Sequence, residues 1–281
     1  MTTAFAPLHG LRILSLALNL PGPAALLRCR RLGAHCVKLE PPAGDPMGHY
    51  NPGAYAELHE GVQVLQADLK TPEGQAVLEG ELAQAHVLLT SFRPSALHKL
   101  GLGWKELHGR HPRLSQVAIV GAAGERAEEP GHDLTYLAEH GLVTGLALPA
   151  TLYADMSGAL MACEAVLQAA LCRTEGRHLE VPLAGAAGWL ALPRRWGLTQ
   201  ETGAVGGAHA GYRVYACRNG RVAVAALEPH FAKRLCEMAG VEPRMDAQGT
   251  HEALAAFFAG RSRAEIDALA AKRDLPLHTM E

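Results

Sequence analysis

Aromatic residues make up only 5% of the 281-residue chain, and its formal net charge is -2 at pH 7. The basic residues are scattered rather than gathered in runs. A groove that tracks a phosphate backbone needs clustered cations, and a platform for bases needs aromatic side chains. The sequence therefore predicts no nucleic-acid partner.

Long apolar runs are also lacking. The richest window, residues 160–171, is interrupted by Cys163, Glu164 and Gln168, which is unlike a membrane-spanning helix. The opening MTTAFAPLHG has neither the basic start nor the apolar run of a secretion signal. We expect no membrane partner and a cytoplasmic location.

Motifs for metals, disulfides and dinucleotides are absent. The six cysteines include no CxxC pair, and the fifteen histidines include no pair at a zinc-binding spacing with further ligands nearby. The cysteines fall in apolar segments, which is typical of reduced core cysteines. There is no GxGxxG fingerprint. We expect no metal.

What the sequence does contain is a regular alternation of strands and helices. The apolar run 11–17, a helix over about 24–32 and the run 34–40 form a βαβ unit. Buried parallel strands read as short apolar runs of this kind. Further strands are expected at 62–68, from 85, at 113–120 and from 178, with helices from Thr71 and over about 156–173. This pattern predicts an α/β fold with a Rossmann-like, mostly parallel sheet.

The last part of the sequence has a different pattern. Glycine is frequent over 201–211, which predicts a linker between a large domain at 1–200 and a small α+β domain at 212–281. Two alternating strands meet there at Asn219-Gly220, a strong hairpin signal. Helices are expected near 229–238, 251–258 and 262–272.

Several segments together resemble one enzyme family. They are LHGLRILSLALNLPGP, GAHCVKLEPPAGDP, ADLKTPEG, SFRPSALHKLGLG, PGHDLTYLAEHG, ADMSGAL and ALEPHF. From residue 8 to about 275 they are similar to the class III CoA-transferase (CaiB/BaiF-like) family, which includes the α-methylacyl-CoA racemases. The GHD, AD and EPxF motifs, at His132, Asp155 and Glu228, most resemble the racemase branch. The resemblance implies an acyl-CoA substrate and an interlocked dimer.

Asp155 is the first candidate catalytic residue. It stands just ahead of the long predicted helix, so one interpretation is that it is an N-cap and has no catalytic role. In the transferases that the chain resembles, the matching Asp is instead a nucleophile that forms an acyl-aspartyl anhydride and then an aspartyl-CoA thioester. In the racemases it is an acid/base group.

His132 is the residue that separates these two chemistries. A histidine between Gly131 and Asp133 could be an ordinary loop residue, but the resemblance pairs it with Asp155 in moving a proton at the carbon next to a thioester. Glu228, beside Pro229, is either a carboxylate at a helix N-terminus or an auxiliary catalytic residue.

The resemblance also implies a binding site for coenzyme A. Lys70, Arg93 and Lys99 would face the nucleotide phosphates, although solvated surface charge is the alternative for each. They follow strand ends or loops, where a doubly wound sheet binds ligands. The residues expected to bind coenzyme A are Leu20, Pro21, Lys70, Phe92, Arg93, Lys99 and Asp133.

The chain departs from the family pattern in a few places. It has HEGV at 59–62 where the family usually has NRGK, and only a short connection over 141–152. It ends at LPLHTME, where relatives are expected to continue. We therefore expect a chain that is short at its C-terminus.

Three functions remain open from the sequence. The first is racemase-like proton transfer on a 2-methylacyl-CoA by His132 and Asp155. The second is a CoA-transferase that uses Asp155 as nucleophile and a carboxylic acid as acceptor. The third is a catalytically silent subunit that partners a full-length paralogue. The expected assembly is accordingly a homodimer or a heteromer.

Overall fold

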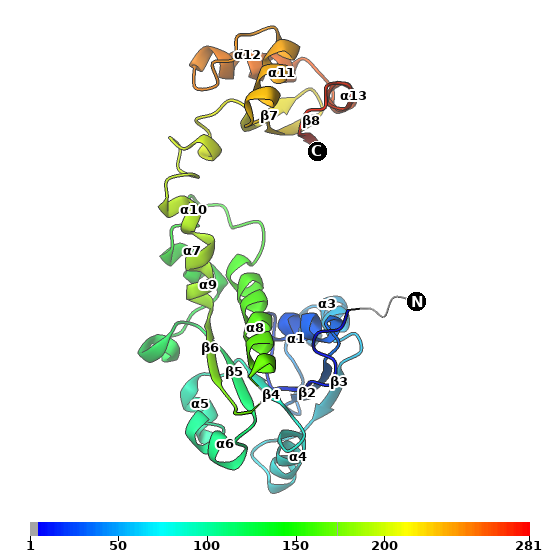
Figure 1. Cartoon of the computed structure of the whole chain (residues 1–281), viewed down its shortest axis with the longest axis vertical. Helices are drawn as coiled ribbons and strands as arrows, with labels where there is room; N and C mark the ends of the chain where they lie inside the picture. The colour runs from blue at the N-terminus through cyan, green and yellow to red at the C-terminus, as the bar shows by residue number, and fades with distance from the viewer. Residues whose placement is uncertain (1–4, 173) are drawn as a thin grey trace. The chain divides into compact units, whose positions relative to one another are not determined.

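The computed structural model describes residues 5–172 and 174–281. The chain forms two compact units, Met1–Ala191 and Leu192–Glu281 (Figure 1). The glycine-rich segment 201–211 lies within the second unit. The large domain at 1–200 and the small domain at 212–281 remain predictions in their exact bounds.

The first unit is built on a six-stranded sheet with the order β3-β2-β1-β4-β5-β6. Every neighbouring pair is parallel. The order runs outward in both directions from the β1–β4 pair, as in doubly wound folds. This confirms the predicted α/β class with a Rossmann-like parallel sheet. The strands are β1 (Arg12–Ser15), β2 (His35–Glu40), β3 (Gln63–Gln66), β4 (Val87–Thr90), β5 (Ser115–Val120) and β6 (His178–Pro182).

Helices cover both faces of this sheet because its central strands are apolar on both sides. Within β1, Ile13 packs into the cluster that contains α1 and α8, whereas Leu14 packs into the cluster that contains α4 and α6. Successive side chains of a strand point to opposite faces, which explains the division. The helices of this unit are α1 (Pro21–Arg31), α2 (Met47–Tyr50), α3 (Pro52–Leu58), α4 (Pro72–Leu82), α5 (Pro94–Lys99), α6 (Trp104–Arg110), α7 (Asp133–Glu139), α8 (Tyr153–Leu171) and α9 (Leu183–Leu190), with a 3-10 turn, η1 (Gly124–Glu128).

Most of the residues that helix α8 buries are small. The sequence predicts that Leu160, Cys163, Leu167 and Leu171 share one packed side. Cys163 is buried and Leu167 packs partly buried against the core, but Leu160 and Leu171 are 50% and 86% exposed. The expectation was wrong for these two residues, because α8 packs closely against α1 and α9, and close approach of helices favours small side chains. Arg173, the expected end of the helix, lies outside the described residues. The residues of α8 that are buried are Ala154, Gly158, Ala159, Ala162, Cys163, Ala165, Val166 and Ala169.

The second unit is a small α+β arrangement, as predicted. Its antiparallel sheet has the order β7-β8-β9, with β7 (Tyr212–Cys217) and β8 (Gly220–Ala225) joined at the expected turn. Strand β9 (Leu277–Met280) was not predicted, because four residues give too short an alternation to recognise. The helical elements are α10 (Leu192–Arg195), η2 (Ala204–Gly206), α11 (Pro229–Ala239), α12 (Gln248–Ala259) and α13 (Arg263–Arg273).

The expectations about the cysteines and about membrane-spanning helices can be compared with the fold. The cysteines are unpaired, and all are buried except Cys172, which follows the last residue of α8 and is exposed, so a core position was wrong for that residue. Across residues 5–172 and 174–281, no helix is both long enough and apolar enough to span a bilayer.

The closest backbone approach in the first turn of α1 yields a stability prediction. A Cβ atom at Gly22 would collide with the Cβ of Ala17, a rigid neighbour in the segment after β1. We expect Gly22→Ala to lower the free energy of unfolding by about 1–3 kcal/mol, as overpacking of a core does. Denaturant unfolding measures the change.

Gly80 provides the matched control. It lies exposed in α4, and no atom lies within 4 Å of a Cβ built there. Gly80→Ala should therefore raise the free energy of unfolding by up to about 1 kcal/mol through helix propensity. Equal effects of the two substitutions would contradict the close approach at Gly22.

Candidate functional site

A cavity of about 390 Å³ opens within the first unit, where the chain leaves β1, β4 and β5. This is the crevice at the carboxyl ends of the strands where doubly wound sheets bind ligands. Both polar and apolar side chains line it. Of the residues predicted from the sequence, the cavity brings together Leu20, Pro21, Phe92, Arg93, His132 and Asp155.

Asp155 enters the cavity from the first turn of α8. Burial is the main cause that raises the pKa of its carboxyl from 3.8 to about 6; the charge of Asp133 acts in the same direction, and His132 opposes the shift. The helix begins at Tyr153 with Leu152 as its N-cap, so Asp155 is inside the helix. The N-cap alternative is therefore wrong, and the carboxylate faces the cavity with its pKa close to neutral pH.

Asp133 fixes the backbone beneath this carboxylate. Its side chain is only 5% exposed, and its Oδ1 accepts a hydrogen bond of 3.0 Å from the backbone N–H of Asp155. Asp133 is the first residue of α7, so the bond ties the start of α7 to the start of α8. Its predicted part in binding coenzyme A stays a prediction.

His132 precedes α7 and is exposed at the cavity. Its backbone N–H donates to the Oγ1 of Thr135 at 3.0 Å, which fixes the entry of the chain into the helix. His132 and Asp155 both line this cavity. Two groups that can each carry a proton therefore border one cavity.

The predicted basic residues are not equally close to the cavity. Arg93 is exposed and lines it, whereas Lys70 and Lys99 are exposed on the turn after β3 and at the end of α5. Hydrogen bonds from Ser95, with smaller effects of Arg93 and Lys99, hold the pKa of Glu128 below its usual value. The carboxylate of Glu128 thus lies within the electrostatic influence of both Arg93 and Lys99. Binding of phosphates by all three remains a prediction.

Glu228 lies in the second unit, directly before α11. Its side chain makes no capping hydrogen bond to that helix. Its predicted place beside His132 and Asp155 stays a prediction.

Tyr136 is a cavity residue that sequence reasoning missed. It is 8% exposed, and both burial and the charge of Asp155 raise the pKa of its phenol. It lies in the first turns of α7, four residues after His132, which precedes that helix in an extended conformation. The motif GHDLTY carried that spacing, but α7 was not among the expected helices.

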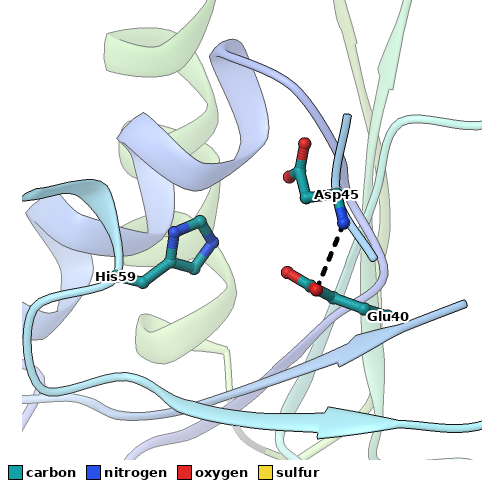
Figure 2. Close-up of side chains that lie close together, drawn as sticks. All are labelled: Glu40, Asp45 and His59. Atoms are coloured by element: carbon teal, nitrogen blue, oxygen red, sulfur yellow. Dashed lines mark hydrogen bonds between the residues drawn. The ribbon is translucent and has the colours of Figure 1, made fainter. Parts of the chain in front are cut away.

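A second polar cluster lies buried beside the cavity loops. The carboxylates of Glu40 and Asp45 and the imidazole of His59 offer ligand atoms within 4.8 Å of one another (Figure 2). The Nζ of Lys38 lies 3.0 Å from Glu40, 2.5 Å from Asp45 and 2.8 Å from His59. An ammonium group thus takes the place among these atoms that a metal cation would need.

The imidazole of His59 has a defined role in this cluster. Its Nδ1 lies 2.6 Å from the carbonyl oxygen of Tyr55, so this nitrogen carries the proton, and Nε2 accepts from Lys38. Burial is the main cause that lowers the pKa of His59; Lys38 lowers it too, while the Tyr55 carbonyl, Glu40 and Asp45 oppose the shift. His59 is therefore neutral in the folded state near pH 7.

Comparison with known proteins identifies the relatives of this chain. The family model described as CoA-transferase family III matches residues 8–281. The α-methylacyl-CoA racemase of Homo sapiens is 27% identical over 256 residues, which cover 84% of this chain and 65% of the racemase. The succinyl-CoA–D-citramalate CoA-transferase of Chloroflexus aurantiacus is 35% identical over 123 residues, 41% of this chain and 31% of that protein. The matches thus span between a third and two thirds of these relatives.

Solved structures show the same fold. A hypothetical protein from Mycobacterium tuberculosis has a TM-score of 0.84 at 22% identity, with 98% of this chain and 86% of that chain covered. A CAIB/BAIF family protein from Brucella suis has a TM-score of 0.81 at 22% identity, with 98% and 84% covered.

The raised pKa of Asp155 predicts a pH-dependent cost to stability. Since the pKa of this carboxyl rises from its ordinary value of 3.8 to about 6 on folding, the folded chain binds the proton more readily, and stability is lost as pH rises through that interval. We expect Asp155→Asn to raise the Tm at pH 7.5 and to raise it much less at pH 4. Thermal melts across this range measure the difference. The exposed Glu164 on the same helix gives the control, Glu164→Gln, which should show no such trend.

The lowered pKa of His59 predicts the opposite dependence. Here the unfolded chain binds the proton more readily, so the stabilisation is present above about pH 6.5 and is lost as pH falls below it. We expect His59→Gln, which can still accept from Lys38, to reduce the fall in Tm between pH 7.5 and pH 5.5. His9→Gln, at an exposed position, should leave the fall unchanged. If the Tm of the wild type and of His59→Gln fell by the same amount between pH 7.5 and pH 5.5, a buried neutral imidazole would be ruled out.

Proposed function

The chain belongs to CoA-transferase family III, and from this premise we propose that it catalyses racemase-like proton transfer at the α-carbon of a 2-methylacyl-CoA. The observation that supports the proposal is the pair of proton carriers, Asp155 and His132, on the wall of one cavity. An ideal acid/base group has a pKa near the working pH. The pKa of about 6 for Asp155 meets that requirement.

In the proposed reaction one group removes the α-proton and the other returns it from the opposite face. When the Asp155 carboxylate takes the proton, the electron pair of the C–H bond passes into the thioester as an enolate. The protonated His132 then gives its proton to the carbon, and the reverse direction exchanges the two roles. Glu228 is proposed as an auxiliary group.

Binding of the coenzyme A part is assigned to the loops around the same cavity. Leu20 and Pro21 would pack against the ligand, and Phe92 would add an apolar surface. The guanidinium of Arg93 is a donor for a phosphate. Lys70 and Lys99 are proposed to contribute at longer range, and Asp133 through the start of α8.

A CoA-transferase activity is the second candidate, because the same carboxylate could act as a nucleophile. A partly buried carboxylate at a cavity wall suits attack on a thioester as well as proton transfer. The names of the curated relatives include both a racemase and CoA-transferases. A carboxylic acid would then be the acceptor.

We also propose that the protein assembles with a second chain, either its own copy or a paralogue. The motivating observation is the exposure of three large apolar side chains, Leu160 at 50% and Leu171 at 86% on α8, and Trp189 at 69% on α9. Exposed apolar surface of this kind marks association sites. In the silent-subunit alternative, a paralogue would cover it and supply the activity.

Deuterium exchange distinguishes these functions. The protein is incubated with a panel of 2-methylacyl-CoAs in deuterated water, with and without a free carboxylic acid, and mass spectrometry follows both products. We expect deuterium at the α-carbon, and we expect Asp155→Asn and His132→Asn each to slow uptake by about 100-fold or more, as loss of a general acid or base does. His9→Asn should leave the rate unchanged.

The other outcomes each have a meaning. Movement of coenzyme A to the acid without α-deuterium, together with an aspartyl adduct trapped by hydroxylamine, would replace the racemase proposal with the transferase. If a folded chain gave neither product, both proposals would be overturned. Light scattering on the same sample then measures the molar mass, and a monomer would favour the silent subunit that needs a paralogue.

A further inference from the structure

The carboxylate of Asp45 connects the buried cluster around Lys38 to the cavity. Lys38 is 0% exposed, Glu40 and Asp45 are each 2% exposed, and His59 is 8% exposed. Lys38 and Glu40 lie on β2, and Asp45 lies in the loop between β2 and α2. Figure 2 shows the bond from the N–H of Asp45 to Oε2 of Glu40, which measures 3.2 Å.

Asp45 reaches out of this cluster to the loop after β1. Both of its carboxylate oxygens accept from the backbone N–H of Asn19 at 3.1 Å, and Oδ1 also accepts from the N–H of Met47 at 2.9 Å. Leu18, Asn19, Leu20 and Pro21 all line the cavity. One buried acid thus holds the backbone of a segment that forms the cavity wall.

Asn19 needs such a restraint. Its φ is +64°, the left-handed region that side chains other than glycine seldom adopt. Asparagine tolerates this region better than most residues, but the conformation persists only where its surroundings impose it. Pro21 then begins α1, so the direction in which the chain enters that helix depends on Asn19.

Lys38 makes it possible for Asp45 to do this while buried. An isolated buried carboxylate would take up a proton instead of staying charged, whereas a paired one with its hydrogen bonds satisfied stays ionised. The ammonium donates to Asp45 and His59 and forms an ion pair with Glu40, and the hydroxyl of Tyr55 donates to Glu40 at 3.0 Å. Lys38 is thereby the cation shared by both buried carboxylates.

We propose that the Lys38–Glu40–Asp45–His59 cluster is a positioning device that holds Asn19 and the loop 18–21 in the shape that receives coenzyme A. The cluster does not touch the ligand; it acts through the N–H of Asn19. The inference rests on the proposed function for the identity of the ligand, but not for the restraint on the loop.

Asp45→Asn tests the device with little change of shape, because it removes the charge and replaces one acceptor with an amide NH2 beside Lys38. Hydrogen exchange followed by mass spectrometry should show faster exchange at the amide of Asn19 than in the wild type. Calorimetric titration with coenzyme A should show a Kd about tenfold higher, a change of about 1.4 kcal/mol. Circular dichroism and the Tm confirm that the variant is folded.

Tyr55→Phe is the matched control. It removes the hydroxyl that donates to Glu40 but keeps the ring that stacks on His59 at 4.1 Å, and it leaves the bond from Asn19 to Asp45 in place. We expect exchange at Asn19 and the Kd to stay close to the wild-type values. If Tyr55→Phe matched Asp45→Asn in both, the effect would be general loss of stability and the proposal would fall.

A double-mutant cycle shows whether Asp45 acts through the loop. Asn19→Ala strains the left-handed backbone directly, so its effect on the Kd should not add to that of Asp45→Asn. Additive effects would overturn the proposal, as would unchanged exchange at Asn19 in Asp45→Asn. A wild type that protects Asn19 but binds no coenzyme A would contradict the proposed ligand while leaving the restraint on the loop established.

Discussion

The cavity exists because the strand order reverses between β1 and β4. From β1 the chain crosses to β2 on one side, and later it returns to β4 on the other. The connections that leave these neighbouring strands must therefore diverge, and parallel strands leave the space between their carboxyl ends open. Leu18 to Pro21 follow β1, and Ser91 to Arg93 follow β4, so both diverging segments become walls of the cavity.

Much of the parallel sheet could be predicted from the sequence, because buried parallel strands are short apolar runs in the sequence. The run 11–17 predicted β1, and its clear ends at Gly10 and at the Pro21-Gly22-Pro23 turn made it readable. Short helices such as α2, with four residues, carry too few turns to show a period. Helix α7 was missed for the same reason, although its motif had already identified His132.

The burial of the charged residues Lys38 and Glu40 could not be predicted from the sequence pattern. In HCVKLE, Lys38 and Glu40 alternate with apolar residues, which on a half-exposed strand would put both in water. Instead both are buried, because Asp45 and His59 arrive from later segments and complete their hydrogen bonds. Only three-dimensional contacts could reveal that compensation. Likewise, the outward position of Leu160 depends on how closely α1 approaches α8, which no periodicity in α8 specifies.

Two buried acids each hold the backbone of one wall of the cavity. Asp45 accepts from the N–H of Asn19, and Asp133 accepts from the N–H of Asp155. Since both bonds go to backbone, they fix the position of a segment without constraining which side chain it presents. The charge of Asp45 is paired with the ammonium of Lys38, which it shares with Glu40, and after burial it is a further cause that raises the pKa of the Tyr50 phenol at the cavity. The charge of Asp133 instead acts on the carboxyl of Asp155 and helps burial to raise its pKa to about 6. Each acid therefore restrains a backbone segment and also acts on a titratable side chain of the cavity, Asp45 on Tyr50 and Asp133 on Asp155.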